Sequence, residues 1–417
     1  MAAPKLRFRE FDIYWNSVAI GNFLKIKSGL GFKAEEYTTE EAIRLLQIEN
    51  VGYGTVKWTH NVKFVPHNYL ENHQDLVLNE DDIVLALNRP VTNDQLKIAK
   101  LTKQDSPSIL YQRVGKLEFK KNEIDSGFIF QIFQKDVKNY VLNSSIGSDQ
   151  PFISTTHLYK HKLHIPSKPE QTKIASFLSA VDEKIAQLSQ KHQLLSQYKQ
   201  GMMQKLFSQQ IRFKADDGNE FGAWESKKLN EIGQSFNGLV GKSKEDFGEG
   251  EAYITYKQIF DHRKINLNNV NFVNIQPNDT QNMVKKGDLF FTTSSETADE
   301  VAYCSAILDD FEFPLYLNSF CFGYRPNSAN ILNSAYASFY FRSEIFRNKI
   351  NHLAQGSTRF NISKTAFMNV VIHLPMLEEQ TKIANFLSAI DQKIDVVSEQ
   401  LEQAKLWKKG LLQQMFV

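Results

Sequence analysis

The sequence contains only two cysteines, Cys304 and Cys321, among its 417 residues. Their number and spacing exclude a disulfide framework and a cysteine-based metal site. No apolar run reaches the roughly 18 residues of a membrane-spanning helix. The opening residues, Met1-Ala-Ala-Pro-Lys5, lack the apolar core of a signal peptide. These absences predict a cytoplasmic protein with no membrane partner.

Charge of one sign is not in excess, since 49 basic residues face 47 acidic ones and the net charge is +2. This balance does not by itself indicate a nucleic-acid-binding protein. Basic residues do outnumber acidic ones locally, in residues 1–33 and 342–364. Such clusters are compatible with a surface that faces phosphates and equally with ordinary solvated charge.

Catalytic motifs are also missing. Gly241-Lys242-Ser243 resembles the end of a phosphate-binding loop, but Gly238 precedes it too closely for that motif. Glu118-Phe-Lys120 resembles part of a nuclease motif, yet this triplet is frequent by chance. No nucleophile elbow and no methyltransferase motif is found. The sequence therefore predicts no catalytic residue, no metal and no cofactor bound by this chain.

What the sequence does contain is a pair of long heptad stretches, residues 170–207 and 379–416. Apolar residues recur in a 4-3 rhythm, which is typical of a helix that buries one narrow stripe against another helix. Lys199 and Lys408 occupy the same late position on this seam. A lysine there usually extends into water at a frayed end, and less often it marks register or a partner contact. The predicted seam consists of Ile174, Leu178, Val181, Ile185 and Leu188 in the first stretch and Ile383, Leu387, Ile390, Ile394 and Val397 in the second.

The two stretches belong to an internal repeat with a constant offset of 209 residues, seen for example between Trp15 and Trp224. An internal repeat of this length changes the expected fold more than any local signal. The further matched pairs are Gly29-Leu30 with Gly238-Leu239, Gly147-Ser148 with Gly356-Ser357, Ile153-Ser154 with Ile362-Ser363, and His164-Ile-Pro166 with His373-Leu-Pro375.

The repeat predicts an α+β protein of two similar globular domains, each followed by a long helix. The helices are expected to pack as an antiparallel coiled coil, giving the chain an internal pseudo-two-fold. The predicted divisions are a first domain at 1–166 with its N-terminal segment 1–16, a helix at 167–212, a second domain at 213–375 and a helix at 376–417.

Short apolar clusters bounded by Gly, Asn, Asp or Pro predict strands and turns inside each domain. A helix is predicted at 331–350, an exposed turn at 214–223, and a helix or a helix passing into a strand at 39–48. The predicted strands are 18–26, 83–87 and 128–133 in the first domain and 252–259, 288–293 and 319–324 in the second.

Without a catalytic site, binding is the remaining function. Arg, Lys, Asn and Gln side chains can pair with base edges and phosphates, although each of them can also be a plain surface residue. The DNA-binding candidates are Lys25, Lys27, Lys33, Tyr53, Lys57 and Arg89 in the first domain and Lys242, Lys244, Tyr256, Lys257, Arg263, Lys264, Gln355, Ser357 and Arg359 in the second.

The doubled motif resembles the specificity subunit of Type I restriction–modification systems. The resemblance covers the whole chain and is carried by three pairs of segments. They are His164-Ile-Pro…Glu170-Gln-Thr-Lys-Ile-Ala with its copy His373-Leu-Pro…Glu379-Gln-Thr-Lys-Ile-Ala, Tyr198-Lys-Gln-Gly with Trp407-Lys-Lys-Gly, and Leu6-Arg-Phe…Trp15 with Ile211-Arg-Phe213…Trp224.

The resemblance implies that each globular domain recognises one half of a bipartite, asymmetric target in double-stranded DNA, with the helices as spacer. It further implies that two methyltransferase subunits dock on the chain and that restriction subunits add translocation and cleavage. S-adenosylmethionine, ATP and Mg would then be bound by those partner subunits. Individual base-reading residues do not carry over from the family.

Two other functions stay open at this point. The chain could be the recognition part of a single-chain methyltransferase or nuclease, or it could be a coiled-coil adaptor that binds only protein. A methylation assay on the lone protein distinguishes the first, and binding to random duplex DNA distinguishes the second.

Overall fold

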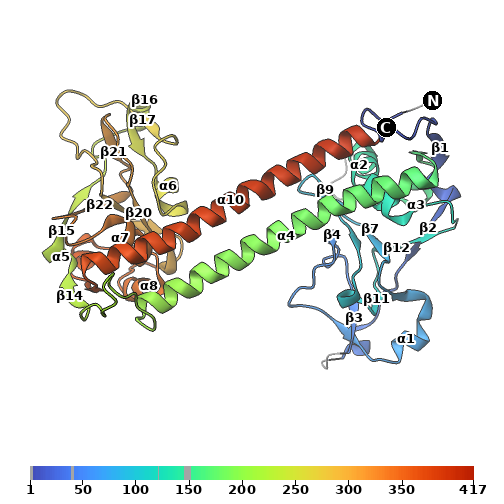
Figure 1. Cartoon of the computed structure of the whole chain (residues 1–417), viewed down its shortest axis with the longest axis horizontal. Helices are drawn as coiled ribbons and strands as arrows, with labels where there is room; N and C mark the ends of the chain where they lie inside the picture. The colour runs from blue at the N-terminus through green and yellow to red at the C-terminus, as the bar shows by residue number, and fades with distance from the viewer. Residues whose placement is uncertain (1–2, 39–41, 121, 145–151) are drawn as a thin grey trace. The chain divides into compact units, whose positions relative to one another are not determined.

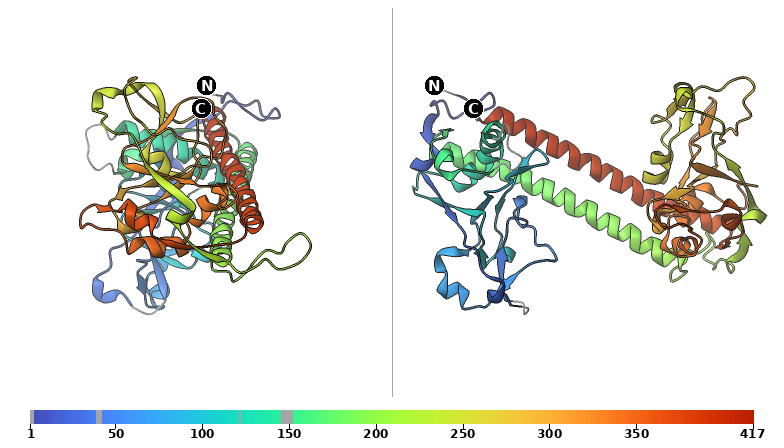
Figure 2. Two further views of the ribbon diagram at one scale, coloured as in Figure 1. Left: turned by 90° about the vertical axis from the view of Figure 1, so that its left-hand side faces the viewer. Right: turned by 180° about the vertical axis from the view of Figure 1, so that it is seen from behind.

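The computed structural model describes residues 3–38, 42–120, 122–144 and 152–417. It forms two compact units, which we call unit 1 (residues 1–189 and 399–417) and unit 2 (residues 190–398). Two long helices, α4 (Lys168–Phe207) and α10 (Leu377–Met415), run from one unit into the other. Both begin two residues before the predicted stretches, so the sequence pattern located them correctly. Each unit thus holds the start of one helix and the end of the other, in antiparallel directions (Figures 1 and 2).

Unit 1 is built around a five-stranded sheet of order β2–β12–β7–β10–β4, in which only the β10–β4 pair is parallel. The strands are β2 (Leu24–Ser28), β12 (Val114–Phe119), β7 (Ile83–Ala86), β10 (Ile98–Lys100) and β4 (Tyr53–Thr55). A second sheet contains β5 (Phe64–Val65), β3 (Ile43–Leu46), β11 (Ser108–Leu110) and β6 (Val77–Leu78). The remaining elements are the pairs β1 (Asn16–Ala19) with β13 (Lys162–Ile165) and β8 (Val91–Thr92) with β9 (Gln95–Leu96), and the helices α1 (Tyr69–Asn72), α2 (Ser126–Ser144) and α3 (Thr155–Leu158).

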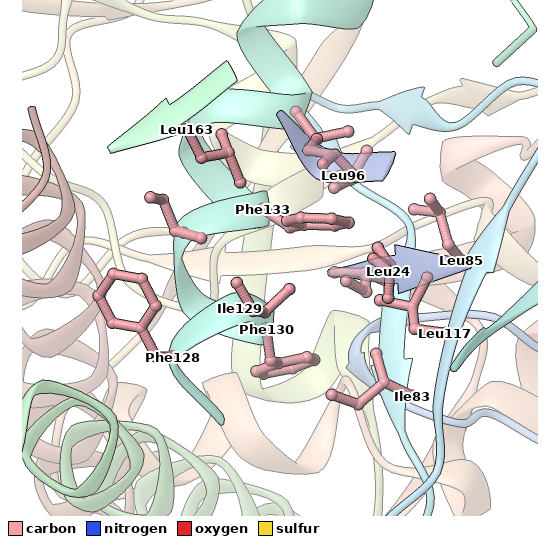
Figure 3. Packing of buried hydrophobic residues seen from close by; sticks show 14 of the residues in the cluster. Leu24, Ile83, Leu85, Leu96, Leu117, Phe128, Ile129, Phe130, Phe133 and Leu163 are labelled. Atoms are coloured by element: carbon pink, nitrogen blue, oxygen red, sulfur yellow. The ribbon is translucent and has the colours of Figure 1, made fainter. Parts of the chain in front are cut away.

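The five-stranded sheet separates two hydrophobic cores, because successive residues of a strand point to opposite faces. On β7, Ile83 and Leu85 face the core beneath α2, whereas Val84 and Ala86 face the core shared with the second sheet. Figure 3 shows the first of these cores, with side chains of α2 packed against the sheet. Both faces of β7 are therefore buried, which explains its continuous apolar sequence.

The strand predicted at residues 128–133 is instead part of α2, and that prediction is wrong. The apolar pattern does not stop at Phe133 but continues at helical spacing with Val137 and Val141, and all three are buried on the same side of α2. A short window showed only an apolar run, which does not distinguish a buried strand from a buried helix.

Helix segments complete the core of unit 1. Leu178 and Val181 near the start of α4 share one core with Leu411 and Met415 at the end of α10. Phe416 follows α10 and places its ring 5.5 Å from Phe128. The ends of the two helices are thus parts of the domain core, which is why the compact units cut across the predicted division into domains and helices.

Unit 2 repeats this construction. Its main sheet has the order β15 (Gly233–Asn237), β22 (Cys321–Pro326), β18 (Leu289–Thr292) and β20 (Cys304–Ala306). A second sheet contains β17 (Asn271–Val273), β16 (Phe247–Ile254) and β21 (Leu315–Leu317). The remaining elements are the pairs β14 (Glu225–Lys228) with β24 (Val371–Leu374) and β19 (Ser294–Ser295) with β23 (Phe360–Asn361), and the helices α5 (Leu229–Ile232), α6 (Tyr256–Asp261), α7 (Ser334–Tyr340), α8 (Glu344–Asn351) and α9 (Lys364–Met368).

Helix caps explain where the predictions for unit 2 fail. The predicted strand 252–259 ends early because the Thr255 side chain accepts a hydrogen bond from Gln258 N and caps α6. The predicted helix 331–350 is two helices, because Ser343 caps α8 in the middle of the range. A capping side chain favours a new helix start over a continuous helix.

The other local predictions can be placed directly. The predicted strand 18–26 is two strands separated by a 3-10 turn at Ile20–Asn22. Strands at 83–87, 288–293 and 319–324 are confirmed by β7, β18 and β22. Residues 214–223 form a turn closed by a bridge between Lys214 and Glu220. Residues 43–46 of the predicted 39–48 segment form β3, while 39–41 and the pair Gly147-Ser148 lie outside the described residues.

Each long helix is fixed at its start by a buried glutamate. Glu170 accepts hydrogen bonds from Arg7 Nε (2.7 Å) and Trp15 Nε1 (3.2 Å). Glu379 in unit 2 accepts from Arg212 Nη2 (2.7 Å) and Trp224 Nε1 (3.1 Å) in the same way. The carboxylates also lie in the first helical turn, where a negative charge is favoured. This arrangement accounts for the repeated tryptophans and for the glutamate that begins the repeated Glu-Gln-Thr-Lys motif.

The predicted seam residues are buried in both helices, except for Ile185 and Ile394, which are half-buried. Within the described ranges, no helix combines the length and the apolar composition needed to cross a bilayer.

Candidate nucleic-acid interface

Both units present a group of loops at the same end of the main sheet, which we call the loop edge. In unit 2 it consists of residues 238–240, 293–295, 318–320 and 355–361. Backbone hydrogen bonds tie these loops together, from Leu239 N to Leu317 O (2.7 Å), Thr293 N to Phe320 O (3.0 Å) and Ile362 N to Thr293 O (3.0 Å).

The loop edge of unit 1 consists of residues 29–31, 87–89, 111–113 and 152–153. Two of its bonds match those of unit 2, from Leu87 N to Arg113 O (2.9 Å) and from Ile153 N to Leu87 O (2.8 Å). The first pair of loops is joined in the reverse sense, because Gln112 N donates to Leu30 O (2.9 Å), whereas Leu239 is the donor in unit 2. The two edges therefore share the same arrangement of strand ends, and the positions joined by matching bonds correspond to one another.

A glycine makes the close approach of these loops possible in each unit. A Cβ atom on Gly238 would lie 2.0 Å from Asn318 O, and one on Gly29 would lie 2.3 Å from Tyr111 O. No other residue fits at either position without moving the backbone. The repeated Gly-Leu pair of the sequence is thus explained by backbone packing, which conserves the shape of the edge in both copies.

The side chains that this shared backbone presents differ between the units. Arg113 in unit 1 and Phe320 in unit 2 occupy equivalent places before β12 and β22, and Phe152 is equivalent to Asn361. Phe320 is 58% exposed and Phe152 is 67% exposed, although large aromatic side chains are usually buried. Exposed aromatic and basic groups side by side are typical of surfaces that bind nucleic acids.

The backbone of unit 1 is unusual at this edge. Arg89 has φ of 44° and Arg113 has φ of 66°, both in the left-handed region that non-glycine residues rarely adopt. Both residues are exposed, so burial of their side chains does not impose this conformation. Strained backbone of this kind clusters at functional sites in proteins, although five other non-glycine residues of this chain also have positive φ.

Four sequence-predicted residues meet at the loop edge of unit 2. Tyr256 donates a hydrogen bond from its hydroxyl to Ser294 O (2.6 Å), and Arg359 donates from Nε to Ser294 Oγ (3.1 Å). Gln355 pairs through its backbone with Asn361 at the base of the loop that carries Ser357. Burial raises the pKa of Tyr256, so the phenol stays protonated near neutral pH and keeps donating.

Other candidates are already engaged within the protein. The guanidinium of Arg263 lies 3.7 Å from the centre of the Phe339 ring, and its Nη2 atom is 2.9 Å from Asp391. Arg263 therefore attaches the domain to α10 and does not point into solvent. Ion pairs also join Lys27 to Asp75, Lys242 to Asp279, Lys257 to Asp261 and Lys264 to Asp309.

The remaining candidates lie on the surface. The Tyr53 hydroxyl is 2.6 Å from Thr92 Oγ1, beside the β8–β9 hairpin. Arg89 belongs to the loop edge of unit 1, as described above. Four further candidates are exposed lysines that belong to neither loop edge as defined here: Lys25, Lys33, Lys57 and Lys244. Their role in binding stays a prediction.

Sequence reasoning did not select Ser294, Phe320, Arg113 or Phe152. Ser294 matters through its contacts with Tyr256 and Arg359, which lie 38 and 65 positions away in the chain. The exposure of Phe320 and Phe152 results from the way the loops close, and neither position carries a motif. The repeated glycines Gly29 and Gly238 were the available signal, since they mark the strand ends from which the loop edge begins.

No metal site is evident at either edge. In the part of the chain that the structure describes, no group of three or more His, Cys, Asp or Glu side chains is placed to hold a metal ion. The side chains that are present at the loop edges offer hydrogen bonding, stacking and charge pairing.

Residues 13–197 and 222–406 each match the model of a protein family described as Type I restriction modification DNA specificity domain. Over 201 residues the chain is 37% identical to the Type I restriction enzyme MjaVIII specificity subunit of Methanocaldococcus jannaschii, covering 48% of this chain and 47% of that protein. It is 29% identical over 171 residues to the Type I restriction enzyme EcoAI specificity subunit of Escherichia coli, covering 41% of this chain and 28% of that protein. The matches thus span about half or less of these two relatives.

A longer match, 27% identical over 312 residues, is to the putative type I restriction enzyme MjaX specificity subunit of M. jannaschii, covering 70% of this chain and 67% of that protein. Among solved structures, the S subunit of a Type I restriction–modification system from M. genitalium has a TM-score of 0.59 at 17% identity, covering 100% of this chain and 99% of that one. This likeness shows that the fold is shared.

Proposed function

The chain belongs to the family of Type I restriction modification DNA specificity domains, and we propose that it selects the DNA sequence on which a Type I restriction–modification complex acts. In this proposal each unit binds one half of a bipartite, asymmetric target in double-stranded DNA. Two methyltransferase subunits and the restriction subunits, which translocate and cleave DNA, assemble on the chain.

The observation that carries this proposal is a shared scaffold with unlike loop edges. Gly29 and Gly238 each allow two loops of the edge to approach closely in the same way. The side chains nearby differ, because Arg113 in unit 1 occupies the place of Phe320 in unit 2. Two like scaffolds suit two stretches of the same polymer, because the duplex backbone is the same everywhere. Unlike side chains at the edge suit two different base sequences, because bases are read by hydrogen bonds and apolar contacts. The target would therefore be asymmetric.

The chemical steps are assigned to partner subunits in this proposal. Methyl transfer would use S-adenosylmethionine bound by the methyltransferase subunits, and translocation and cleavage would use ATP and Mg bound by the restriction subunits. This chain would contribute sequence selection and the attachment of the other subunits.

The test is methylome sequencing of a host that expresses the methyltransferase subunit with or without this chain. We expect one bipartite adenine-methylated motif that appears only when both proteins are present. An unchanged methylome would favour a protein-binding adaptor. Methylation or cleavage of duplex DNA by the purified chain without partner subunits would favour a single-chain enzyme and would refute the proposal.

A further inference from the structure

The loop of residues 355–361 holds its shape through a glycine. Gln355 N donates to Asn361 O (2.9 Å), and Asn361 N donates to Gln355 O (2.8 Å), so the loop is closed at its base. Gly356 has φ of 132°, and a Cβ atom there would lie 2.1 Å from Arg359 O. Only glycine fits, and the tight turn fixes where the Arg359 backbone lies.

The Arg359 side chain is then held in two places. Its Nε atom donates to Ser294 Oγ (3.1 Å), and its guanidinium carbon lies 5.8 Å from the centre of the exposed Phe320 ring. Ser294 is itself fixed, because β19 pairs with β23 and Tyr256 donates to its carbonyl oxygen. One edge of the guanidinium is thus oriented by the protein while the residue stays exposed to solvent.

Arg359 differs in this from every other arginine of unit 2, all of whose residues the structure describes. Arg212 and Arg325 are bound by buried carboxylates of Glu379 and Asp288. Arg263 is paired with Asp391, and Arg342 donates to backbone carbonyls such as Cys304 O and Ile259 O. Arg347 donates to Ala302 O, Asp299 O and Asn351 Oδ1. Neither terminal nitrogen of Arg359 has a hydrogen-bond acceptor within unit 2, and no carboxylate there pairs with it.

We propose that Arg359 is a specificity-determining residue of unit 2 and reads a guanine through the major groove. The two unpaired nitrogens form the fork that matches the O6 and N7 acceptors of guanine. A contact with phosphate needs charge but not a fixed orientation, whereas reading a base needs the plane of the guanidinium to be set. Ser294 and Phe320 set that plane. This inference rests on the function proposed above.

The test uses the complete complex with its methyltransferase subunits and compares wild-type protein with Arg359→Lys, Arg359→Ala and Gly356→Ala. Arg359→Lys keeps the charge and removes the fork, and Gly356→Ala keeps the guanidinium and displaces it. The matched control is Lys286→Ala, which removes an exposed charge from the opposite end of β18 in the same unit.

We expect both Arg359 variants to lose roughly 10- to 100-fold discrimination at one guanine position, in a single half-site, the range for one lost bidentate base contact. Gly356→Ala should relax the same position. The other half-site and the Lys286→Ala methylome should not change, and the Tm and subunit assembly of Arg359→Lys should match wild type.

Three results would overturn the inference. An unchanged motif in both Arg359 variants would show that Arg359 does not read a base. A uniform loss of affinity, with the motif kept and a shallower dependence of binding on salt, would identify a phosphate contact. A wild-type complex that methylates no bipartite motif would refute the proposed function, and this inference with it. This third result can be told apart from the first two because it is seen with the wild-type protein and not only with the variants.

Discussion

Lys408 of α10 and Asp182 of α4 form an ion pair within unit 1, with 2.6 Å between Nζ and Oδ1. The equivalent residues of unit 2, Lys199 and Asp391, form the same ion pair. Asp182 also accepts a hydrogen bond from Gln131 of α2 (2.8 Å), so the carboxylate joins both helices to the domain. The shared lysine of the two heptad stretches thus marks register, which was the less common of the two readings considered for it.

Removing this ion pair should destabilise unit 1. We expect Lys408→Met to lower the free energy of unfolding by about 1–2 kcal/mol, because Asp182 loses a charged partner in a partly buried place. Urea denaturation measures the change. Lys405→Met is the control on the same helix, because its pair with Glu402 is exposed and should contribute less than about 0.5 kcal/mol. Equal effects of the two substitutions would show that the Lys408 pair has no special role.

The depth of burial along the seam predicts a graded response. Leu178 is fully buried and Ile185 is half-buried, although the heptad pattern treats them alike. We expect Leu178→Ala to cost about 2–5 kcal/mol and Ile185→Ala less than about half as much, because a cavity forms only where the site cannot reach water. Thermal unfolding of both variants checks this. A larger loss for Ile185→Ala would contradict the packing described for unit 1.

Asp136 of α2 predicts a dependence of stability on pH. Its burial raises the pKa to about 6, and Lys135, 3.8 Å away, opposes this only partly. The folded state therefore holds this proton more tightly than the unfolded state. The tightly held proton adds to the free energy of unfolding. This contribution is complete below the unfolded pKa of about 4 and is lost as the pH rises through about 6.

The comparison with Asp136→Asn isolates this effect. We expect wild type to lose about 2–3 kcal/mol relative to the variant between pH 4 and pH 7, as measured by urea denaturation across that range. If wild type instead gained stability relative to the variant between pH 4 and pH 7, the Asp136 carboxylate would be stabilised in the folded state.

Exchange of one domain should change one half of the recognised sequence. We expect a chimera in which residues 225–375 come from another family member to keep the half-site of unit 1 and to acquire a new second half-site. Boundaries at these residues leave Trp224 and Glu379 in place, so the start of α10 stays anchored. Methylome sequencing reads the result, and a change in both half-sites would contradict two independent recognition units.

The large features of the fold could be predicted from the sequence because each of them occurs in both copies of the internal repeat. The offset between Trp15 and Trp224 showed that the chain has two like halves, and the two heptad stretches located both long helices to within about two residues. Local elements were harder to predict, since Thr255 and Ser343 start new helices through single hydrogen bonds that a hydrophobic pattern does not register.

Only part of the candidate interface could be predicted, because residue type does not show which side chains are exposed and unpaired in the folded protein. Residue type selected Arg359 and Tyr256 but equally selected Arg263, because composition does not show which arginine is already paired. The difference is made by Asp391, which is remote in sequence and reaches Arg263 only in the folded chain. Phe320 carried no signal at all, because its exposure depends on how the loops meet.

The core that unit 1 shares with the end of α10 also fixes an order of events during synthesis. Leu411, Met415 and Phe416 pack with the first domain, and Leu6 N donates to Gln414 O (2.9 Å). Unit 2 is continuous in sequence and has all its residues once Ser398 has left the ribosome. The domain that is translated first must therefore wait, with part of its core exposed, until the domain translated second is complete. A frameshift after residue 398 would therefore remove core residues from unit 1, the unit that contains the N-terminus, and would leave the residues of unit 2 unchanged.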